Sequence, residues 1–186
     1  SSDVCSSDLS FISLNFDLHK QLFFRTLATH FVFTGSLVSC KEHQKALSLG
    51  NRTVLNNIPT GSIIHSLTTS SHSNKISFAR SAGTFCQLLQ KGITTNKIRL
   101  PSGVVITASN SSYATLGMVS NLQHNLVFLG KAGKSRLKGV RPCVRGVAMN
   151  PVDHPHGGRT NGGRPSVTPW GIPTKGKPTV KKKIYV

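Results

Sequence analysis

Between residues 50 and 128, apolar and polar positions alternate with a period of two, the pattern of β-strands that pack one face and expose the other. The clearest case is a hairpin over residues 97–107, in which Pro101 presets the turn and Gly103 closes it. Around that turn we expect a packed face made by Ile98, Leu100, Val104 and Ile106, and a basic face made by Lys97, Arg99 and Thr107.

Further strands are predicted where apolar runs lie between Gly, Asn or Pro residues, at residues 62–67, 84–89, 113–119 and 125–129. Short strands at such close spacing suit a small β-barrel, which closes its own edges and needs few residues. The expected fold class is therefore mainly β, with the barrel over residues 47–129.

Residues 1–46 follow a different pattern. Apolar side chains recur there at helical spacing, and we predict an amphipathic helix over residues 17–32. Such a helix is typical of an organellar import segment, although Asp3, Asp8 and Asp17 are unusual in one. The alternative is an N-terminal helix that packs on a neighbour.

The alternation stops at residue 130, and the remaining sequence is rich in Gly, Pro, Lys and Arg. The chain carries a formal charge of +18, and more than half of its 23 Lys and Arg residues lie in this last segment. From residue 43 onward the only acidic residue is Asp153. Such a segment cannot build a core of its own, and its charge favours a polyanion as partner. We predict an extended tail over residues 130–186 that lies against nucleic acid.

Within the tail, the Val-Asp-His-Pro-His run at residues 152–156 contains the side chains that can bind a metal, transfer a proton or hydrogen-bond to RNA. Two prolines keep this backbone extended, so His154 and His156 should point to one side and Asp153 to the other. Imidazoles stack on bases or donate to phosphate and 2′-hydroxyl oxygens. Asp153 either bonds nearby backbone amides to set the turn or faces the RNA.

The same run leaves two alternatives open. Asp153, His154 and His156 are residue types that can bind a metal ion, and a metal site formed by them would indicate a metal-dependent hydrolase. The alternation splits them between two faces, and neither a fourth ligand nor a nucleophile is evident, so we do not expect an enzyme. The other alternative is a nucleic-acid-binding regulator that acts outside any larger particle.

Three further features limit the interpretation. Trp170 either anchors the tail on the barrel, which we favour, or stacks on a nucleotide. The four cysteines form no C-x-x-C pair, so neither a disulfide framework nor a structural zinc site is expected. An uninterrupted apolar run of about 18 residues is lacking, and no membrane span is predicted.

The order of short motifs along the chain closely resembles the C-terminal half of the universal large-subunit ribosomal protein family uL2. The matching blocks include the Val-Asp-His-Pro-His-Gly-Gly run and a Thr-Pro-Trp-Gly run. The resemblance covers residues 47 to about 179. Its blocks lie at residues 57–61, 79–84, 98–103, 114–117, 124–126, 129–133, 141–142, 145–158 and 168–171.

The resemblance implies an SH3-like β-barrel and an extended tail that enters the core of the large-subunit rRNA near the peptidyl transferase centre. It implies a structural constituent of the large ribosomal subunit that supports assembly and translation. No catalytic side chain is expected, and no cofactor besides rRNA-associated magnesium. By motif position, the histidine that the family links to peptidyl transfer and subunit assembly is His154, with Asp153 and His156 beside it. The residues expected to contact rRNA are Arg80, Lys131, Lys134, Arg136, Lys138, Arg141, Arg145, Asn150, His154, His156, Arg159, Arg164, Lys175 and Lys177.

The chain departs from the family in two places. Family members usually carry a glycine-rich insertion with a glutamate after His-Pro-His-Gly-Gly, whereas Arg159 follows Gly158 directly. The tip of this loop is therefore expected to sit differently. In addition, residues 1–46 neither match the family's N-terminal OB-fold domain nor suffice to form it.

The missing OB-fold resembles the situation in plant mitochondria, where this protein can be encoded as two separate pieces. We therefore expect a mitochondrial ribosome in the matrix, with a plastid or the bacterial cytoplasm as the alternative. Residues 1–46 would then include the targeting segment. The expected partners are large-subunit rRNA, other large-subunit ribosomal proteins and a separate OB-fold piece of the same protein, and no membrane.

Overall fold

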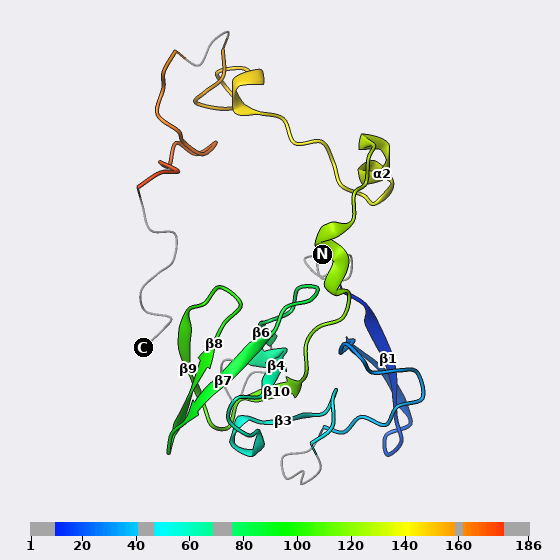
Figure 1. The fold of residues 1–186 in the computed structure, drawn as a ribbon. Helices are drawn as coiled ribbons and strands as arrows, with labels where there is room; N and C mark the ends of the chain where they lie inside the picture. The colour runs from blue at the N-terminus through cyan, green and yellow to red at the C-terminus, as the bar shows by residue number, and fades with distance from the viewer. Residues whose placement is uncertain (1–9, 41–46, 69–75, 159–161, 177–186) are drawn as a thin grey trace. The chain divides into compact units, whose positions relative to one another are not determined.

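The computed structural model describes residues 10–40, 47–68, 76–158 and 162–176 (Figure 1). The chain divides between Val127 and Phe128 into two compact units. The first, which contains all of the described strands, is called the barrel unit below, and the second is called the tail unit.

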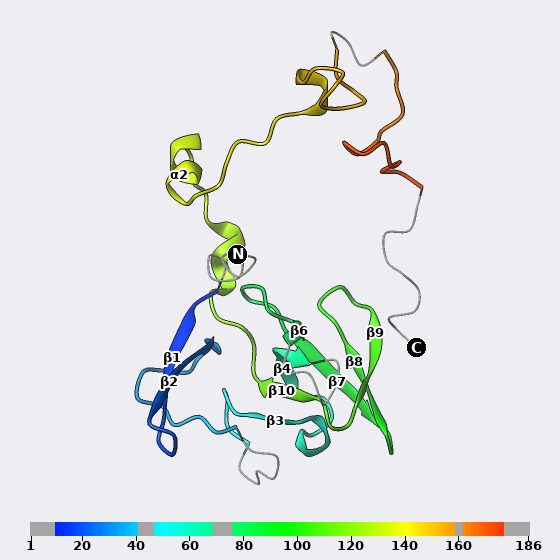
Figure 2. The ribbon, with the colours of Figure 1, turned by 180° about the vertical axis from the view of Figure 1, so that it is seen from behind.

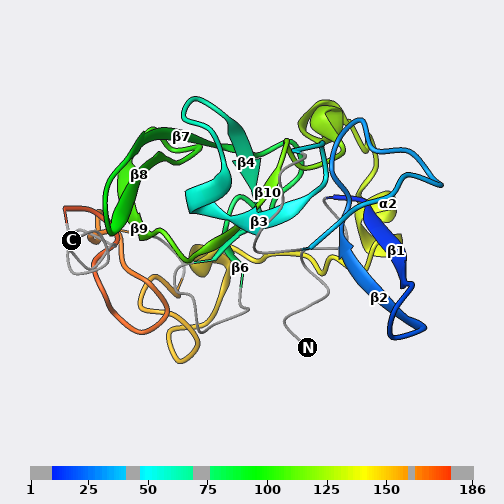
Figure 3. The same ribbon diagram turned by 90° about the horizontal axis from the view of Figure 1, so that it is seen from below.

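The centre of the barrel unit is a six-stranded antiparallel sheet in the order β3-β10-β4-β7-β8-β9. Figure 3 shows from below how this sheet curls into a half-barrel. A second, smaller sheet pairs β5 (Leu67–Thr68) with β6 (Ile76–Phe78). The architecture is mainly β and agrees with the predicted SH3-like β-barrel. The six strands are β3 (Arg52–Val54), β4 (Ile63–His65), β7 (Cys86–Lys91), β8 (Thr95–Arg99), β9 (Val105–Ser109) and β10 (Tyr113–Leu116), and the 3-10 helix η1 (Leu55–Asn57) follows β3.

The inward faces of these strands form one apolar core. The predicted hairpin is confirmed, because β8 pairs with β9 and Ile98, Leu100 and Ile106 are all buried. Val104 is the exception, since it lies in the turn before β9 begins and is 47% exposed. Full burial of a Leu or Ile side chain contributes roughly 1.5–3 kcal/mol, so this core is what stabilises the unit. Its other members are Leu55, Ile58, Ile64, Leu67, Ala79, Cys86, Leu88, Ala108, Ala114 and Leu116.

Three of the other predicted strands are present with altered limits. Residues 84–89 and 113–119 correspond to β7 and β10. Residues 62–67 are divided into β4 and β5 by Ser66, whose φ of 53° is left-handed. The sequence did not predict β3 or β6, because strands of three residues are too short to display an alternation.

The strand predicted at residues 125–129 is wrong. The chain there leaves the 3-10 helix η2 (Leu122–Leu126), which begins after Asn121 in the left-handed conformation. The amides of His124 and Val127 donate to the carbonyls of Asn121 and His124, at 3.1 and 3.2 Å. These local bonds satisfy the backbone without a neighbouring strand.

The predicted N-terminal helix over residues 17–32 is also wrong, because the structure has a β-hairpin there (Figure 2). Strand β1 (Ile12–Asp17) pairs with β2 (Leu22–Leu27). The carboxylate of Asp17 accepts the amides of His19 and Lys20 at 2.9 and 3.2 Å, which sets the turn between the strands. The hydrogen bonds from the backbone amides of Lys20 and His19 lower the pKa of the Asp17 carboxyl group. Phe and Thr favour strands, and here the period of two prevails over the helical one.

The segment after the hairpin is attached to the barrel by strand-like pairing. Thr29 forms an isolated bridge with Val119, and the amide of His30 donates to the carbonyl of Met118 at 2.8 Å. Further along, Cys40 pairs with Arg52 at the edge of β3. Isolated bridges at its two ends therefore tie the segment 28–40 to the barrel unit.

His65 is buried where this segment meets the barrel. Its Nε2 lies 2.9 Å from the hydroxyl of Thr29, and its Nδ1 lies 2.9 Å from the hydroxyl of Ser66. Burial lowers the pKa of His65 to about 4, and the positive charge of Arg52 adds to the effect. The imidazole is thus a neutral hydrogen-bonding residue at neutral pH.

The cysteines and the helices add two observations. Cys40, Cys86 and Cys143 are free thiols, and burial raises the pKa of Cys86 to about 11.

Within the described ranges, no helix has the length and apolar character needed to cross a bilayer.

Candidate nucleic-acid interface

The tail unit begins with a short helix, α2 (Ala132–Leu137), where the sequence predicted an extended chain. The helix ends in a Schellman motif, in which Gly139, with a φ of 81°, donates to the carbonyl of Arg136 and Val140 donates to that of Ser135. Ala, Lys, Arg and Leu are strong helix formers, and the glycine after them was the signal that would have predicted this helix.

The cations on and around this helix are exposed. Lys131 precedes its first turn, Lys134 lies within the helix, and Lys138 follows its last turn. Arg136, Arg141 and Arg145 are exposed as well. No ion pair involves these side chains within the described part of the chain, so their charge is available to an external anion.

Residues 145–158 form a closed loop that is held by its own backbone, and we call it the histidine loop. It starts with the 3-10 helix η3 (Gly146–Ala148). The carbonyl of Asn150 accepts the amides of Asp153 and His154, at 3.0 and 3.3 Å. The amide of Gly158 then returns to the carbonyl of Met149 at 3.1 Å and closes the loop. The predicted extended conformation is therefore wrong here, because turns satisfy the backbone where no core is available.

His154 is the side chain around which the histidine loop folds. It is 8% exposed, and its Nδ1 accepts the amide of His156 at 3.0 Å. A neutral imidazole that accepts at Nδ1 carries its proton on Nε2, so His154 keeps a single N–H donor. The rings of His154 and His156 lie 4.8 Å apart, which confirms that the two point to the same side.

Two glycines make the packing around His154 possible. A Cβ atom on Gly146 would lie 2.7 Å from Nδ1 and Cε1 of the His154 ring. A Cβ atom on Gly157 would overlap the carbonyl of Asn150. Neither glycine is among the residues predicted as a site, and the contact with His154, eight residues further on, shows why a side chain cannot stand at position 146.

The histidine loop is joined to the next turn of the tail by two side chains. His156 Nε2 lies 2.8 Å from the carbonyl oxygen of Pro165 and 3.3 Å from the amide nitrogen of Val167. The guanidinium of Arg164 donates to the carbonyl of Pro155 at 2.7 Å. The turn itself is closed by a bridge between Val167 and Pro173.

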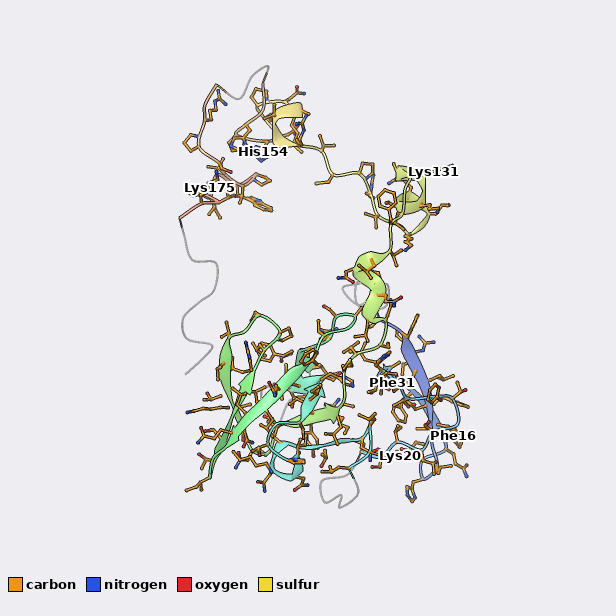
Figure 4. All side chains as sticks on the ribbon, viewed as in Figure 1. Phe16, Lys20, Phe31, Lys131, His154 and Lys175 are labelled. Carbon is orange, nitrogen blue, oxygen red and sulfur yellow. The ribbon has the colours of Figure 1, made fainter. Side chains whose placement is uncertain are left out.

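These contacts gather polar and basic groups at one shallow cleft. Arg164 and Lys175 are exposed cations in it, and His156 of the histidine loop is a half-buried member of its lining. Lys175 and His154 are labelled in Figure 4. Arg and Lys side chains are the groups that most often contact the phosphate and sugar of a nucleic acid. The cleft is lined by His156, Arg164, Pro165, Ser166, Pro173 and Lys175.

The remaining predicted site residues are distributed as follows. Arg80 is exposed on the barrel unit after β6, and Asn150 is exposed in the histidine loop. Arg159 and Lys177 lie outside the described residues. Lys97 and Arg99 of β8 are exposed opposite the core, as predicted for the basic face of the hairpin.

One of the alternatives for Asp153 is not supported. Asp153 is exposed and its carboxylate accepts no hydrogen bond from the described residues, so it does not set the turn, which Asn150 closes instead. Trp170 is 82% exposed within the tail unit, and both of its expected roles stay predictions. A contact of Asp153 with RNA also stays a prediction.

A metal centre also lacks support from the geometry. Among the residues that the structure describes, no three His, Cys, Asp or Glu side chains come together as ligands would. Nδ1 of His154 is occupied by the backbone amide of His156, and Asp153 does not join the two imidazoles.

An SH3-like barrel followed by an exposed cationic segment, whose described residues form no apolar core, defines a small β-barrel protein with a basic extension. The model of a family described as Ribosomal Proteins L2, C-terminal domain, matches residues 48–171. The chain belongs to this family, which confirms the resemblance seen in the sequence.

Individual relatives agree with the family assignment. The large ribosomal subunit protein uL2 of Methylococcus capsulatus is 52% identical over 141 residues, which are 74% of this chain and 51% of that protein. The large ribosomal subunit protein uL2 of Ehrlichia chaffeensis is 50% identical over 136 residues, 72% of this chain and 49% of that protein. The chain thus spans about half the length of the curated relatives that it matches.

Proposed function

We propose that this chain is a structural constituent of the large ribosomal subunit, and that its tail unit binds large-subunit rRNA. The proposal rests on how the tail unit is held together and on which of its side chains stay exposed. Backbone hydrogen bonds and one buried imidazole fix its turns, while Lys131, Lys134 and Arg136 remain exposed and without ion pairs in the described ranges. A segment of this kind gains its full stability by neutralising phosphates. Membership of the L2 family supports the same assignment.

Sedimentation tests this proposal directly. The tagged full-length chain should co-sediment with large subunits and remain with them through a high-salt wash, because many simultaneous phosphate contacts dissociate slowly. Recovery of the chain only in the soluble fraction at the top of the gradient would overturn the proposal. Nucleic-acid complexes that persist without ribosomal particles would favour the regulator instead.

We further propose that the histidine loop lies near the peptidyl transferase centre and positions rRNA without side-chain catalysis. The single N–H donor of His154 suits a phosphate, a 2′-hydroxyl or a base carbonyl. His154→Ala should leave the barrel folded but impair subunit assembly or peptide synthesis, whereas the exposed Val152→Ala should have no effect. Normal assembly and translation with His154→Ala would contradict this assignment.

The mitochondrial location and the separate OB-fold piece belong to the proposal as well. Both rest on the observation that residues 1–46 lie outside the part of the chain that matches the family. The predicted amphipathic helix no longer supports an import segment, because residues 12–27 form a hairpin. Mass spectrometry of the N-terminus of the particle-bound protein tests the location, and a search for an OB-fold polypeptide among the proteins of the same particles tests the separate piece. A mature N-terminus downstream of residue 1 in mitochondrial particles is expected, and an uncleaved chain in bacterial particles would contradict the location.

A further inference from the structure

The N-terminal hairpin has one face that nothing in the proposed function uses. The register of β1 with β2 pairs Ile12 with Leu27, Leu14 with Arg25 and Phe16 with Phe23. Residues paired in this way project from the same side of a hairpin. These six side chains are called the hairpin face, and the rings of Phe16 and Phe23 lie 5.0 Å apart on it.

The hairpin face is a contiguous exposed apolar surface. Leu14 is 66% exposed and Phe23 is 69% exposed, and Ile12 and Phe16 are each about half exposed. With about 200 Å² for each aromatic side chain, the open apolar area is on the order of 400 Å². An apolar patch of about 300–600 Å² is the largest on a typical monomer and is often functional.

The opposite face of the hairpin contains a cluster of polar side chains. The amide of Asn15 donates to the hydroxyls of Thr26, at 2.7 Å, and Ser13, at 3.3 Å, and these two hydroxyls lie 2.8 Å apart. Phe24 and Leu22 also lie on this side, but this polar cluster satisfies its own hydrogen bonds. The two sides therefore differ in the polar cluster, which interrupts the apolar surface beside the exposed Leu22 and Phe24 and has no counterpart on the hairpin face.

The hairpin is also held firmly on the barrel unit. The amide of Phe11 donates to the hydroxyl of Ser120 at 3.1 Å, and the amide of Ser120 donates to the carbonyl of Ala28 at 3.0 Å. The bridge between Thr29 and Val119 continues this pairing. A partner would therefore meet a preformed surface at low cost in conformational entropy.

Charge indicates what kind of partner fits. Residues 10–40 contain only Asp17, Lys20 and Arg25 as charged residues, so RNA would find almost no cations there. A second copy of this chain, with a formal charge of +18, would be repelled. Arg25 projects from the middle of the apolar face and forms no ion pair with any described residue.

We propose that the hairpin face docks a different protein, whose surface is apolar and places a carboxylate against Arg25. Covering the face would remove apolar area from water, and the carboxylate would satisfy the guanidinium when it loses contact with solvent. This inference rests on the proposed function only for the place where the partner is found, the large-subunit particle.

The test is a site-specific cross-link in assembled particles. A benzophenone-bearing amino acid replaces Phe16 in the full-length chain, and a matched chain carries it at Asn15, on the same strand but the other face. We expect position 16 to cross-link to one particle protein, at an apolar peptide that contains Asp or Glu, and position 15 to give little of this product. Equal yields from both positions would overturn the proposal.

A charge change at Arg25 adds a second criterion. Arg25→Glu should lower the cross-link from position 16 by about tenfold or more, whereas Arg25→Lys should retain it. A product with rRNA or with a second copy of this chain, or no product in particles that contain the chain, would overturn the docking proposal. Absence of the chain from the particles would instead overturn the proposed function, so the two failures are distinguishable.

Discussion

The barrel unit buries a continuous set of apolar side chains, whereas the tail unit buries only His154 and Gly157 among its described residues. Both units have defined turns, but they are stabilised differently. In the barrel unit the hydrophobic effect is the dominant favourable contribution. In the tail unit, turns, a Schellman motif and hydrogen bonds from His156 and Arg164 hold the chain while its cations face outward. The difference shows that a segment without a core can still present charges in a fixed arrangement.

The largest expected effect is in the core of the barrel unit. Ile98→Ala should lower the free energy of unfolding by about 2–5 kcal/mol, because Ile98 is fully buried and its removal leaves a cavity. Ile93→Ala is the control, since Ile93 is 99% exposed and should change stability by less than about 0.5 kcal/mol. Denaturant unfolding of the full-length chain measures both, and similar effects would contradict the assignment of the core.

Protonation of His65 should destabilise the barrel unit in acid. Its pKa is lowered to about 4 when folded, from 6.5, so the unfolded chain binds the proton first as the pH falls. Stability should be complete above pH 6.5 and should decline by about 3 kcal/mol in total as the pH falls to 4. Unfolding measured across this range should show the decline, and His65→Gln should remove most of it. An equal decline in the variant would refute the role of His65.

In the tail unit, a methyl group should disturb the histidine loop without affecting the barrel. Gly146→Ala places a Cβ atom 2.7 Å from the ring of His154, and overpacking of this kind costs about 1–3 kcal/mol. Affinity for an rRNA fragment should fall about tenfold, with unchanged unfolding of the barrel. Gly133→Ala in α2 is the control, because nothing lies within 4 Å of its Cβ position. Equal affinities of the two variants would show that the loop geometry is unimportant.

The smallest expected effect concerns a single cation. Lys134→Gln removes one exposed charge from α2, and the salt dependence of rRNA binding should become less steep by about 0.7–0.9 in log–log slope. Ser135→Ala, the next residue in the helix, should leave the slope unchanged. Filter binding at several salt concentrations measures the slope, and an unaltered slope for Lys134→Gln would remove this lysine from the phosphate contacts.

The same contrast explains what could be predicted from the sequence. The hairpin at residues 97–107 was predictable, because a proline, a glycine and an alternating pattern lie close together in sequence. The N-terminal hairpin was not, since consecutive Phe23 and Phe24 suit a helical face as well as a strand. In the tail, residue types and charges predicted the candidate cations. The packing of His154 against Gly146 depends on a folded loop, and no local pattern encodes it.

We propose that the tail unit presents its cations to an RNA backbone, and the salt dependence of binding is the sharpest test of this proposal. The affinity of the full-length chain for a large-subunit rRNA fragment is measured over a range of salt concentrations. With on the order of eight phosphate contacts, log affinity should fall against log salt with a slope of about −6 to −7. A slope near zero would contradict the account.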